Sequence, residues 1–166
     1  MSSSRFIISP LRQQDRTAFR SGVVPLDLYF HAQVGQDVRR GLTACFVAEE
    51  RETARIAGYY TLAAAEVPVT DLSSEMTRRL PRYPSVPVAR IGRLAVDEMF
   101  RGCKLGSALL ASAAARAAAS DIAVFALVVD AKDEQAAAFY QHHGFTAYAS
   151  QPTRLIAPIQ SLIRQR

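Results

Sequence analysis

The fold is decided by one stretch of sequence, Arg90-Ile91-Gly92-Arg93-Leu94-Ala95-Val96-Asp97-Glu98-Met99-Phe100-Arg101-Gly102-Cys103-Lys104-Leu105-Gly106-Ser107-Ala108-Leu109-Leu110. Its first part, Ile91 to Val96, is a short apolar run with β-branched ends, which is typical of a buried strand. Asp97 to Lys104 is polar and contains Gly102, which indicates a tight turn. The chain from Leu105 to Ala119 is rich in Leu and Ala, which predicts a helix. A strand, a glycine-containing turn and a helix form a site for anions, because the first N–H groups and the positive dipole end of the helix point toward the turn.

The turn resembles the acyl-CoA site of the GNAT acyltransferase superfamily. The family pattern is Gln/Arg-x-x-Gly-x-Gly/Ala, and here it is Arg101-Gly102-Cys103-Lys104-Leu105-Gly106, so that Arg101 and Gly106 match. Lys104 stands where the family usually has glycine. Because lysine carries a Cβ, the sequence leaves open whether this residue adopts a left-handed conformation, although its ammonium is able to meet a phosphate. The alternative for the motif alone is an ordinary strand–helix turn with solvated charges.

The resemblance implies that acetyl-CoA is the cofactor. In the family, backbone N–H groups of the strand before the turn bind the thioester oxygen, and such donors stabilise the negative charge that develops there. This backbone role falls on Leu94, Ala95 and Val96. The pyrophosphate is expected on the turn itself, at Arg101, Gly102, Cys103, Lys104, Leu105, Gly106 and Ser107.

A second segment, Ala138-Phe139-Tyr140-Gln141-His142-His143-Gly144-Phe145, also resembles the superfamily, whose late helix ends in a Phe-Tyr…Gly-Phe pattern. The tyrosine at the position of Tyr140 commonly protonates the departing coenzyme A thiolate in that family. A phenol with a pKa near 10 remains protonated at neutral pH and is able to act as a general acid. The alternative is that Tyr140 is an amphipathic core residue whose hydroxyl finds any acceptor.

The composition is that of one globular domain, which we expect to span residues 1–166. Of the 166 residues, 49% are hydrophobic and 21% are charged, which excludes a disordered chain. No apolar run approaches the roughly 20 residues of a membrane span, and no secretory signal follows the first residues, so we expect a cytoplasmic protein without a membrane partner. The two cysteines, Cys45 and Cys103, lie far apart and lack a metal-ligand spacing, which favours reduced thiols.

The chain alternates between expected strands and helices. We expect helices at residues 11–19, 25–40, 71–80, 106–119 and 133–144, the last with Asp133 as N-cap and Gly144 as C-cap. Expected strands are residues 6–8, 43–48, 56–62, 91–96, 122–129, 145–148 and 155–159. Residues 43–48 and 56–62 should pair antiparallel around a charged turn. The fold class is therefore α/β (α+β), with a mixed, mostly antiparallel central sheet flanked by helices.

The net charge of +5 comes almost entirely from arginine, since lysine occurs only at Lys104 and Lys132. Arginine favours bidentate phosphate contacts, so a polyanionic partner and a generic basic protein are the two alternatives. Three prolines in seven residues, Pro81, Pro84 and Pro87, favour an extended loop rather than a helix. Either this loop is a solvated segment, or its arginines follow a phosphate backbone while its tyrosine stacks on a base. The candidates are Arg78, Arg79, Arg82, Tyr83, Arg90 and Arg93.

Other catalytic groups find little support. His142 and His143 precede Gly144, where a cation suits the helix dipole, and nothing connects His31 with an acid or a nucleophile. No metal site is expected. The residues from Arg90 to Val96 contain no carboxylate base, and Asp97, Asp130 or a water remain the alternatives. An α-amine, with a pKa of roughly 7.7–8.0, needs less help to lose its proton than a lysine, so the missing base favours an α-amine acceptor.

A narrower resemblance extends from about Leu26 to Pro158. Over this range the chain resembles the GNAT toxins of bacterial toxin–antitoxin pairs, of the TacT and AtaT type. This resemblance implies that the protein acetylates the α-amine of aminoacyl-tRNA and so blocks translation. It also implies that a small ribbon-helix-helix antitoxin neutralises the protein and that the protein is a homodimer. Two alternatives remain, an acetyltransferase for a small amine or protein N-terminus and a non-catalytic binding module. The matching segments are Cys45-Phe46-Val47, Gly58-Tyr59-Tyr60-Thr61-Leu62, Leu80-Pro81-Arg82-Tyr83-Pro84 and Gly92-Arg93-Leu94-Ala95-Val96-Asp97.

Overall fold

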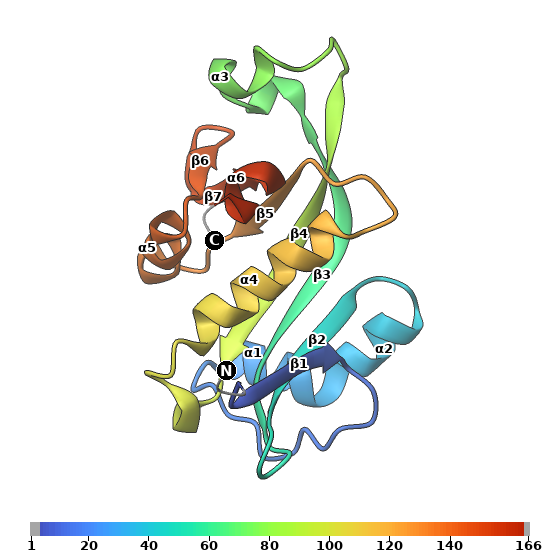
Figure 1. Cartoon of the computed structure of the whole chain (residues 1–166), viewed down its shortest axis with the longest axis vertical. Coiled ribbons are helices and arrows are strands. Elements are labelled where there is room, and N and C mark those ends of the chain that lie inside the picture. Colours follow the sequence, from blue (N-terminus) through green and yellow to red (C-terminus); the bar gives the residue numbers. More distant parts are fainter. Residues whose placement is uncertain (1–3, 165–166) are drawn as a thin grey trace. The chain divides into compact units, whose positions relative to one another are not determined.

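The computed structural model describes residues 4–164, and Figure 1 shows the order of its helices and strands. The strands are β1 (Phe6–Pro10), β2 (Ala44–Glu50), β3 (Ile56–Pro68), β4 (Ser85–Val96), β5 (Ala126–Asp130), β6 (Thr146–Tyr148) and β7 (Gln151–Pro158). The α-helices are α1 (Val24–Leu28), α2 (Val34–Arg39), α3 (Ser74–Thr77), α4 (Leu105–Ala118), α5 (Glu134–His142) and α6 (Ile159–Ile163). A π-helix, η1 (Tyr29–Gln33), joins α1 to α2, and two 3₁₀ turns are η2 (Val69–Asp71) and η3 (Glu98–Phe100).

The strands follow the order β1-β2-β3-β4-β5-β7-β6 in one sheet. The pairs β1–β2, β2–β3, β5–β7 and β6–β7 are antiparallel, whereas β4 and β5 pair in parallel. The predicted mixed and mostly antiparallel sheet is therefore confirmed, together with the antiparallel pairing of β2 with β3. The parallel register ends at Ile91↔Val129, one residue before Gly92.

The chain forms two compact units. The first contains the chain up to Ala63 together with Gly92–Ala113, and the second contains Ala64–Ile91 together with the chain from Ala114 onward. Strands β3 and β4 and helix α4 each contribute to both units. Among the described residues, no helix is long and apolar enough to span a membrane.

Aromatic rings form much of the core of the first unit. The Phe30 and Tyr59 rings stack with centroids 4.2 Å apart, and Phe19 packs edge-on against both. Burial of a side chain such as Phe30 contributes roughly 1.5–3 kcal/mol to stability. The Tyr59 hydroxyl donates to the Leu26 carbonyl at 2.8 Å, so its polar atom is satisfied inside this core. These contacts attach α1 and η1 to β3.

Aliphatic residues form most of the core of the second unit. The side chains of Ala126 through Val129 in β5 are all buried, which explains the continuous apolar run of this strand. Ala126 and Val128 pack with residues of β3, β4, β6, β7 and the segment before α3, namely Val67, Leu72, Val86, Val88, Tyr148 and Ile156. Helices α5 and α6 contact β7 in this unit.

The structure corrects several predicted elements. Residues 11–19 are not helical, because the Asp15 carboxylate accepts from both the N–H and the hydroxyl of Thr17 and stabilises a local turn instead. Strand β4 begins at Ser85 and not at Ile91, so it includes part of the segment that was expected to be a loop. Pro87 fits into the strand because it lacks only the backbone N–H, while its carbonyl accepts from the Phe125 N–H at 2.8 Å. Strand β5 begins only at Ala126, and the predicted strand at residues 155–159 ends at Pro158, where α6 begins.

Candidate functional site

Strand β4 presents two backbone donors away from its neighbour β3. The Arg93 N–H donates to the Thr61 hydroxyl at 3.1 Å, and the Asp97 N–H donates to the Ala57 carbonyl at 2.8 Å, so both point toward β3. Successive N–H groups of a strand alternate between its two edges. The N–H groups of Leu94 and Val96 therefore point to the opposite edge, whereas Ala95 is buried and directs its N–H toward β3. Of the three residues expected to bind the thioester, Leu94 and Val96 direct their N–H groups away from β3 and Ala95 does not.

The turn before α4 adopts the conformation of an anion-binding loop. Gly102 has φ +80°, and Lys104 has φ +60°, so the lysine adopts the left-handed conformation that the sequence had left open. Successive residues of alternating hand direct their N–H groups into one concavity. The Ala108 N–H donates to the Lys104 carbonyl at 3.2 Å, so Leu105, Gly106 and Ser107 form the first turn of α4. This geometry fits a pyrophosphate.

Buried and half-buried polar groups hold this turn in place. The Asp97 carboxylate is 1% exposed and accepts from the N–H groups of Arg20 and Met99, both at 2.9 Å. Since both of its oxygens accept backbone N–H groups, Asp97 caps η3 and is poorly suited to act as a catalytic base. One Arg101 Nη atom donates to the Ser21 carbonyl at 2.6 Å, which fixes the first residue of the turn. Asp130, the other carboxylate considered, is exposed and pairs with Arg154 at 3.5 Å.

Tyr140 lies at the end of α5, where the backbone closes in a Schellman motif. The Phe145 N–H donates to the Tyr140 carbonyl at 3.1 Å, and the Gly144 N–H donates to the Gln141 carbonyl at 3.0 Å. Gly144 has φ +97°, which a residue with a side chain rarely adopts. At the other end, the Asp133 carboxylate accepts from the Ala136 N–H. The predicted N-cap is confirmed, whereas the C-cap is His143, and Gly144 is the left-handed residue that follows it.

The environment of Tyr140 keeps its phenol protonated. The side chain is buried and packs against the rings of Phe139 and Phe145, with centroids 5.1 and 5.4 Å away. Burial raises the pKa of Tyr140 above its ordinary value. Within the described part of the chain, its hydroxyl makes no hydrogen bond to another residue. A neutral donor without an internal acceptor is available to a substrate atom.

The surroundings of the three histidines are those of residues that support the fold. His142 and His143 lie at the end of α5, and burial, together with the neighbouring His142, lowers the pKa of His143. His31 lies 2.9 Å from the Phe19 carbonyl through Nε2. Among residues 4–164, no cluster of three or more His, Cys, Asp or Glu side chains is arranged to hold a metal ion.

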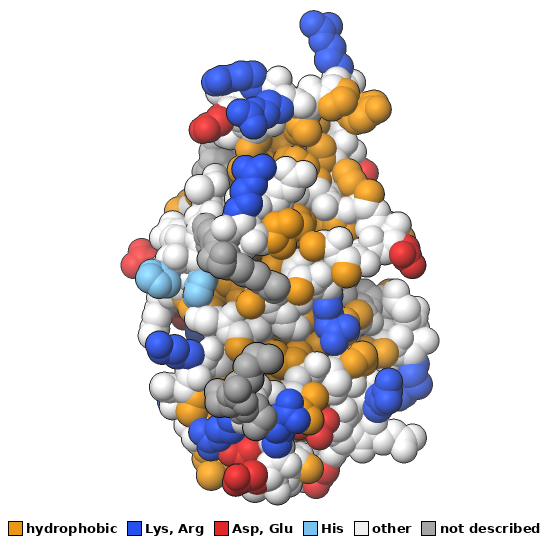
Figure 2. Space-filling model, in the orientation of Figure 1, with side chains coloured by type: hydrophobic (Ala, Val, Ile, Leu, Met, Phe, Trp, Pro, Cys, Tyr) orange, Lys and Arg blue, Asp and Glu red, His pale blue; other side chains and the backbone are white. Residues whose placement is uncertain are grey.

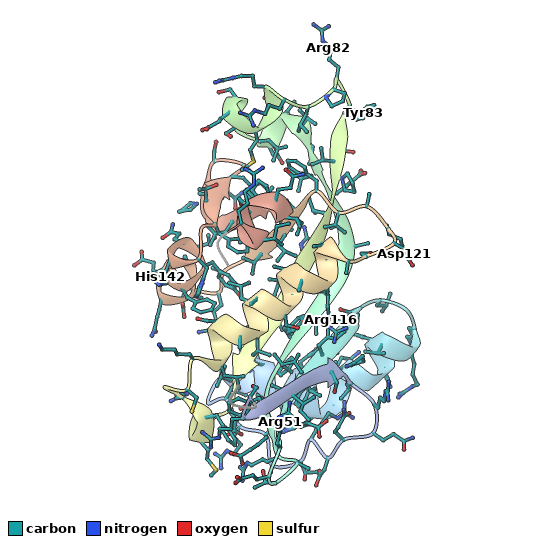
Figure 3. All side chains as sticks on the ribbon, viewed as in Figure 1. Arg51, Arg82, Tyr83, Arg116, Asp121 and His142 are labelled. Atoms are coloured by element: carbon teal, nitrogen blue, oxygen red, sulfur yellow. The ribbon has the colours of Figure 1, made fainter. Side chains whose placement is uncertain are left out.

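The proline- and arginine-rich loop lies beyond α3 in the second unit. Arg78, Arg79 and Arg82 are exposed, and Tyr83 is 63% exposed. Lys and Arg side chains gather over α3 and this loop (Figure 2), and Arg82 extends away from the ribbon (Figure 3). An exposed tyrosine among arginines is suited to a base beside a phosphate backbone.

The two remaining arginine candidates differ from these. Arg90 is half-buried on the part of β4 that belongs to the second unit. Arg93 belongs to the first unit, and its guanidinium carbon lies 3.4 Å from the centroid of the Tyr29 ring. The structure therefore groups Arg78, Arg79, Arg82 and Tyr83 on one loop but engages Arg93 with an aromatic ring.

Thr61 and Tyr29 also belong to this region, although no sequence motif indicates them. Thr61 is 1% exposed, and its hydroxyl accepts a backbone N–H in place of a main-chain carbonyl. A Cβ on Gly92 would lie 2.9 Å from that hydroxyl oxygen. The glycine inside an otherwise apolar strand was the available signal, since such a glycine often marks a bulge or a close approach.

Residues 41–147 match the family model of the acetyltransferase (GNAT) domain. A tRNA-acetylating toxin of Mycobacterium tuberculosis is 35% identical over 144 residues, which are 86% of this chain and 84% of that protein. Two solved structures share the fold. AtaT complexed with acetyl-methionyl-tRNAfMet has a TM-score of 0.87 at 23% identity, covering 96% of this chain and 98% of its own. A mutant AtaT toxin bound to the C-terminus of the antitoxin AtaR and acetyl-CoA has a TM-score of 0.81 at 22% identity, covering 98% of each chain.

Proposed function

This chain belongs to the GNAT acetyltransferase family, and on that premise we propose that it is a toxin that transfers an acetyl group from acetyl-CoA to the α-amine of aminoacyl-tRNA and thereby blocks translation. Acetyl-CoA supplies an activated acetyl group as a thioester. The protein has to bind its pyrophosphate, polarise the thioester carbonyl, admit a neutral amine and protonate the leaving thiolate.

The turn before α4 holds the pyrophosphate. Its support is the pair of left-handed residues, Gly102 and Lys104, together with the N–H groups of the first turn of α4. The Lys104 side chain is exposed and adds a positive charge beside these donors. The residues that we assign to the pyrophosphate are Arg101, Gly102, Cys103, Lys104, Leu105, Gly106 and Ser107.

The N–H groups of strand β4 polarise the thioester. Leu94 and Val96 direct their donors to the edge of β4 that faces away from β3, and Ala95 anchors the strand between them in the core. Fixed donors of this kind lower the barrier to acyl transfer, because they meet negative charge as it develops on the oxygen and need no reorganisation.

Tyr140 is the general acid. Its buried phenol has a raised pKa and is therefore protonated at neutral pH, which a donor to a thiolate requires. The Schellman motif and the contact with Phe145 fix the orientation of this side chain. Asp97 is not available as a protein base, since both of its carboxylate oxygens accept backbone N–H groups. An α-amine made more acidic by the neighbouring ester suits a site of this kind.

The arginine-rich loop binds the tRNA. Its support is three exposed arginines and one exposed tyrosine on a short loop, in a chain with a net charge of +5. This exposed loop is the observation that carries the choice of a polyanionic acceptor over a free small amine. We assign phosphate or base contacts to Arg78, Arg79, Arg82, Tyr83 and Arg90.

The biological setting follows from the same proposal. Residues 1–166 form one catalytic domain that acts in the cytoplasm as a homodimer. A small antitoxin with a ribbon-helix-helix DNA-binding part neutralises it. The antitoxin complex of the structurally similar AtaT supports a partner of this kind.

Transfer of labelled acetyl groups tests the proposal. The purified protein is incubated with acetyl-CoA carrying a labelled acetyl group and with either charged or deacylated tRNA. Label should appear only in charged tRNA, and mild alkaline hydrolysis should release it as an N-acetylamino acid. Label in deacylated tRNA, or only in small amines added as competitors, would refute the assignment of the acceptor.

A further inference from the structure

Strand β4 is held from two directions at Arg93, the residue immediately before the Leu94 donor. The Arg93 N–H donates to the Thr61 hydroxyl at 3.1 Å. The Arg93 guanidinium lies over the Tyr29 ring, with its central carbon 3.4 Å from the ring centroid. Both contacts lie within the first unit of the chain.

The Arg93 N–H donates to the side-chain hydroxyl of Thr61 and not to a main-chain carbonyl of β3. Thr61 is one of few buried polar residues in the described chain, with 1% of its surface exposed. Its oxygen occupies the space next to Gly92, where a Cβ would approach it to 2.9 Å. The parallel pairing of β4 with β5 ends at Ile91, directly before this point. The Thr61 hydroxyl therefore contacts β4 just after its pairing with β5 ends, and just before the Leu94 and Val96 N–H groups that point away from β3.

Tyr29 is itself fixed at both ends. Its hydroxyl donates to the Asp37 carboxylate at 2.8 Å, and Gln33 donates to the other oxygen of that carboxylate at 3.1 Å. Its carbonyl accepts the N–H of Val34, five residues on, as the π-helix requires. A guanidinium on the face of a largely buried ring is attracted by the negative charge of that face. The ring is thus a rigid support for the Arg93 side chain.

We propose that Thr61 and Tyr29 act through Arg93 to fix the direction of the Leu94 and Val96 N–H groups, so that Arg93 is a positioning residue and not a phosphate contact. The peptide plane between Arg93 and Leu94 is rigid, and its orientation depends on how Arg93 is held. Arg93 is half-buried, unlike the exposed arginines of the loop at residues 78–84. The inference rests on the proposed role of β4 in polarising the thioester.

Conservative variants separate positioning from charge. Arg93→Lys keeps the positive charge but removes the planar group from Tyr29. Thr61→Val removes the hydroxyl at nearly constant shape, Thr61→Ser restores it, and Arg12→Lys is the matched control at an exposed arginine of the first unit. Arg93→Lys and Thr61→Val should lower kcat by roughly tenfold, less than the roughly 10²–10³-fold loss that follows removal of one oxyanion donor. The loss should be equal on charged tRNA and on an aminoacyl ester, with KM for acetyl-CoA unchanged and Thr61→Ser near the parent value.

The infrared stretch of the thioester carbonyl gives a readout that needs no acceptor. Acetyl-CoA labelled with carbon-13 at the carbonyl should absorb at lower frequency when bound to the parent protein, and this shift should shrink in Arg93→Lys and Thr61→Val but persist in Thr61→Ser. A parent protein that acetylates no charged tRNA would end the proposed function, yet the carbonyl shift would still decide the inference. Loss of activity on tRNA alone would make Arg93 a phosphate contact. Lower thermal stability with unchanged kcat and carbonyl frequency would leave Arg93 a purely structural residue.

Discussion

Phe145 contacts Tyr140 in two ways at the end of α5. Its N–H donates to the Tyr140 carbonyl at 3.1 Å, and the centroids of the two rings are 5.4 Å apart. A Schellman motif is frequently accompanied by an apolar contact between these two positions. The Phe-Tyr…Gly-Phe pattern therefore has a structural reason, since the last Gly and Phe end the helix and hold the phenol in one orientation.

Removal of the phenol hydroxyl tests the role of Tyr140. Tyr140→Phe should lower kcat by roughly 10²–10⁴-fold while the affinity for acetyl-CoA changes little, because the ring packing remains and only the acid is lost. Steady-state kinetics and a binding titration measure both quantities. Tyr148→Phe, at another buried tyrosine of the second unit, is the control and should keep its activity. Near-parental turnover of Tyr140→Phe would reduce Tyr140 to a packing residue.

Lys104 should be strained by its left-handed backbone. Its φ of +60° costs a residue with a Cβ about 1–2 kcal/mol relative to glycine. Lys104→Gly should therefore have a free energy of unfolding about 1 kcal/mol higher than Lys104→Ala, which keeps the Cβ. Urea denaturation measures the difference, and the same Gly–Ala comparison at Ala54, with φ +59°, is the matched control. Equal stability of the two Lys104 variants would argue against a strained turn.

The assignment of the pyrophosphate to the start of α4 predicts a ligand-dependent melting temperature. Acetyl-CoA should raise the Tm, because a ligand that binds only the native state stabilises it. Gly106→Glu should abolish this rise by placing bulk and negative charge against the pyrophosphate. Ala111→Glu, at an exposed position further along α4, should retain it. If the Tm of Gly106→Glu still rises with acetyl-CoA, the pyrophosphate binds elsewhere.

Buried acidic protons should make the fold sensitive to alkaline pH. Burial raises the pKa of the Cys45 thiol from 9.0 to about 12, and burial, followed by the hydrogen bond to Asp37, raises the pKa of Tyr29 to about 12. Since the folded pKa values are the higher ones, this stability is complete below the unfolded pKa values and falls as pH rises toward about 12.

The urea midpoint should therefore fall as the pH is raised above about 9. Cys45→Ala should flatten this fall, because its unfolded state no longer gains stability by losing the thiol proton. Cys103→Ala is the control, because Cys103 is exposed. A fall of the same steepness in Cys45→Ala and the parent would show that Cys45 is not responsible.

Local signals made the centre of the site predictable. The apolar run, the turn at Gly102 and the Ala-rich segment each specify their own structure, so β4, the turn and α4 were expected from adjacent residues alone. Asp133 and Gly144 likewise determine the ends of α5 through contacts within a few residues. The handedness of Lys104 was the exception, because the surrounding turn overrides the preference of a lysine.

Contacts between distant residues were not predictable in this way. The Thr61–Arg93 hydrogen bond and the Arg93–Tyr29 contact join residues far apart in sequence, and no periodic pattern indicates either. The lengths of β3 and β4 depend on pairing rather than on propensity, which is why prolines near Pro87 concealed the start of β4. The π-helix at Tyr29–Gln33 was hidden for a similar reason, since its sequence is that of an ordinary helix.

The specificity for charged tRNA over a free aminoacyl ester tests the central claim most directly. The ratio of kcat/KM on aminoacyl-tRNA to kcat/KM on the matching ester is measured across a salt series, for the parent and for Arg78→Ala combined with Arg79→Ala. The ratio should be large at low salt and fall steeply as salt rises. The double variant should flatten that slope by up to about two phosphate contacts and leave turnover of the ester unchanged. A ratio that is independent of salt, or equal losses on both substrates in the double variant, would contradict the account and make a small amine the acceptor.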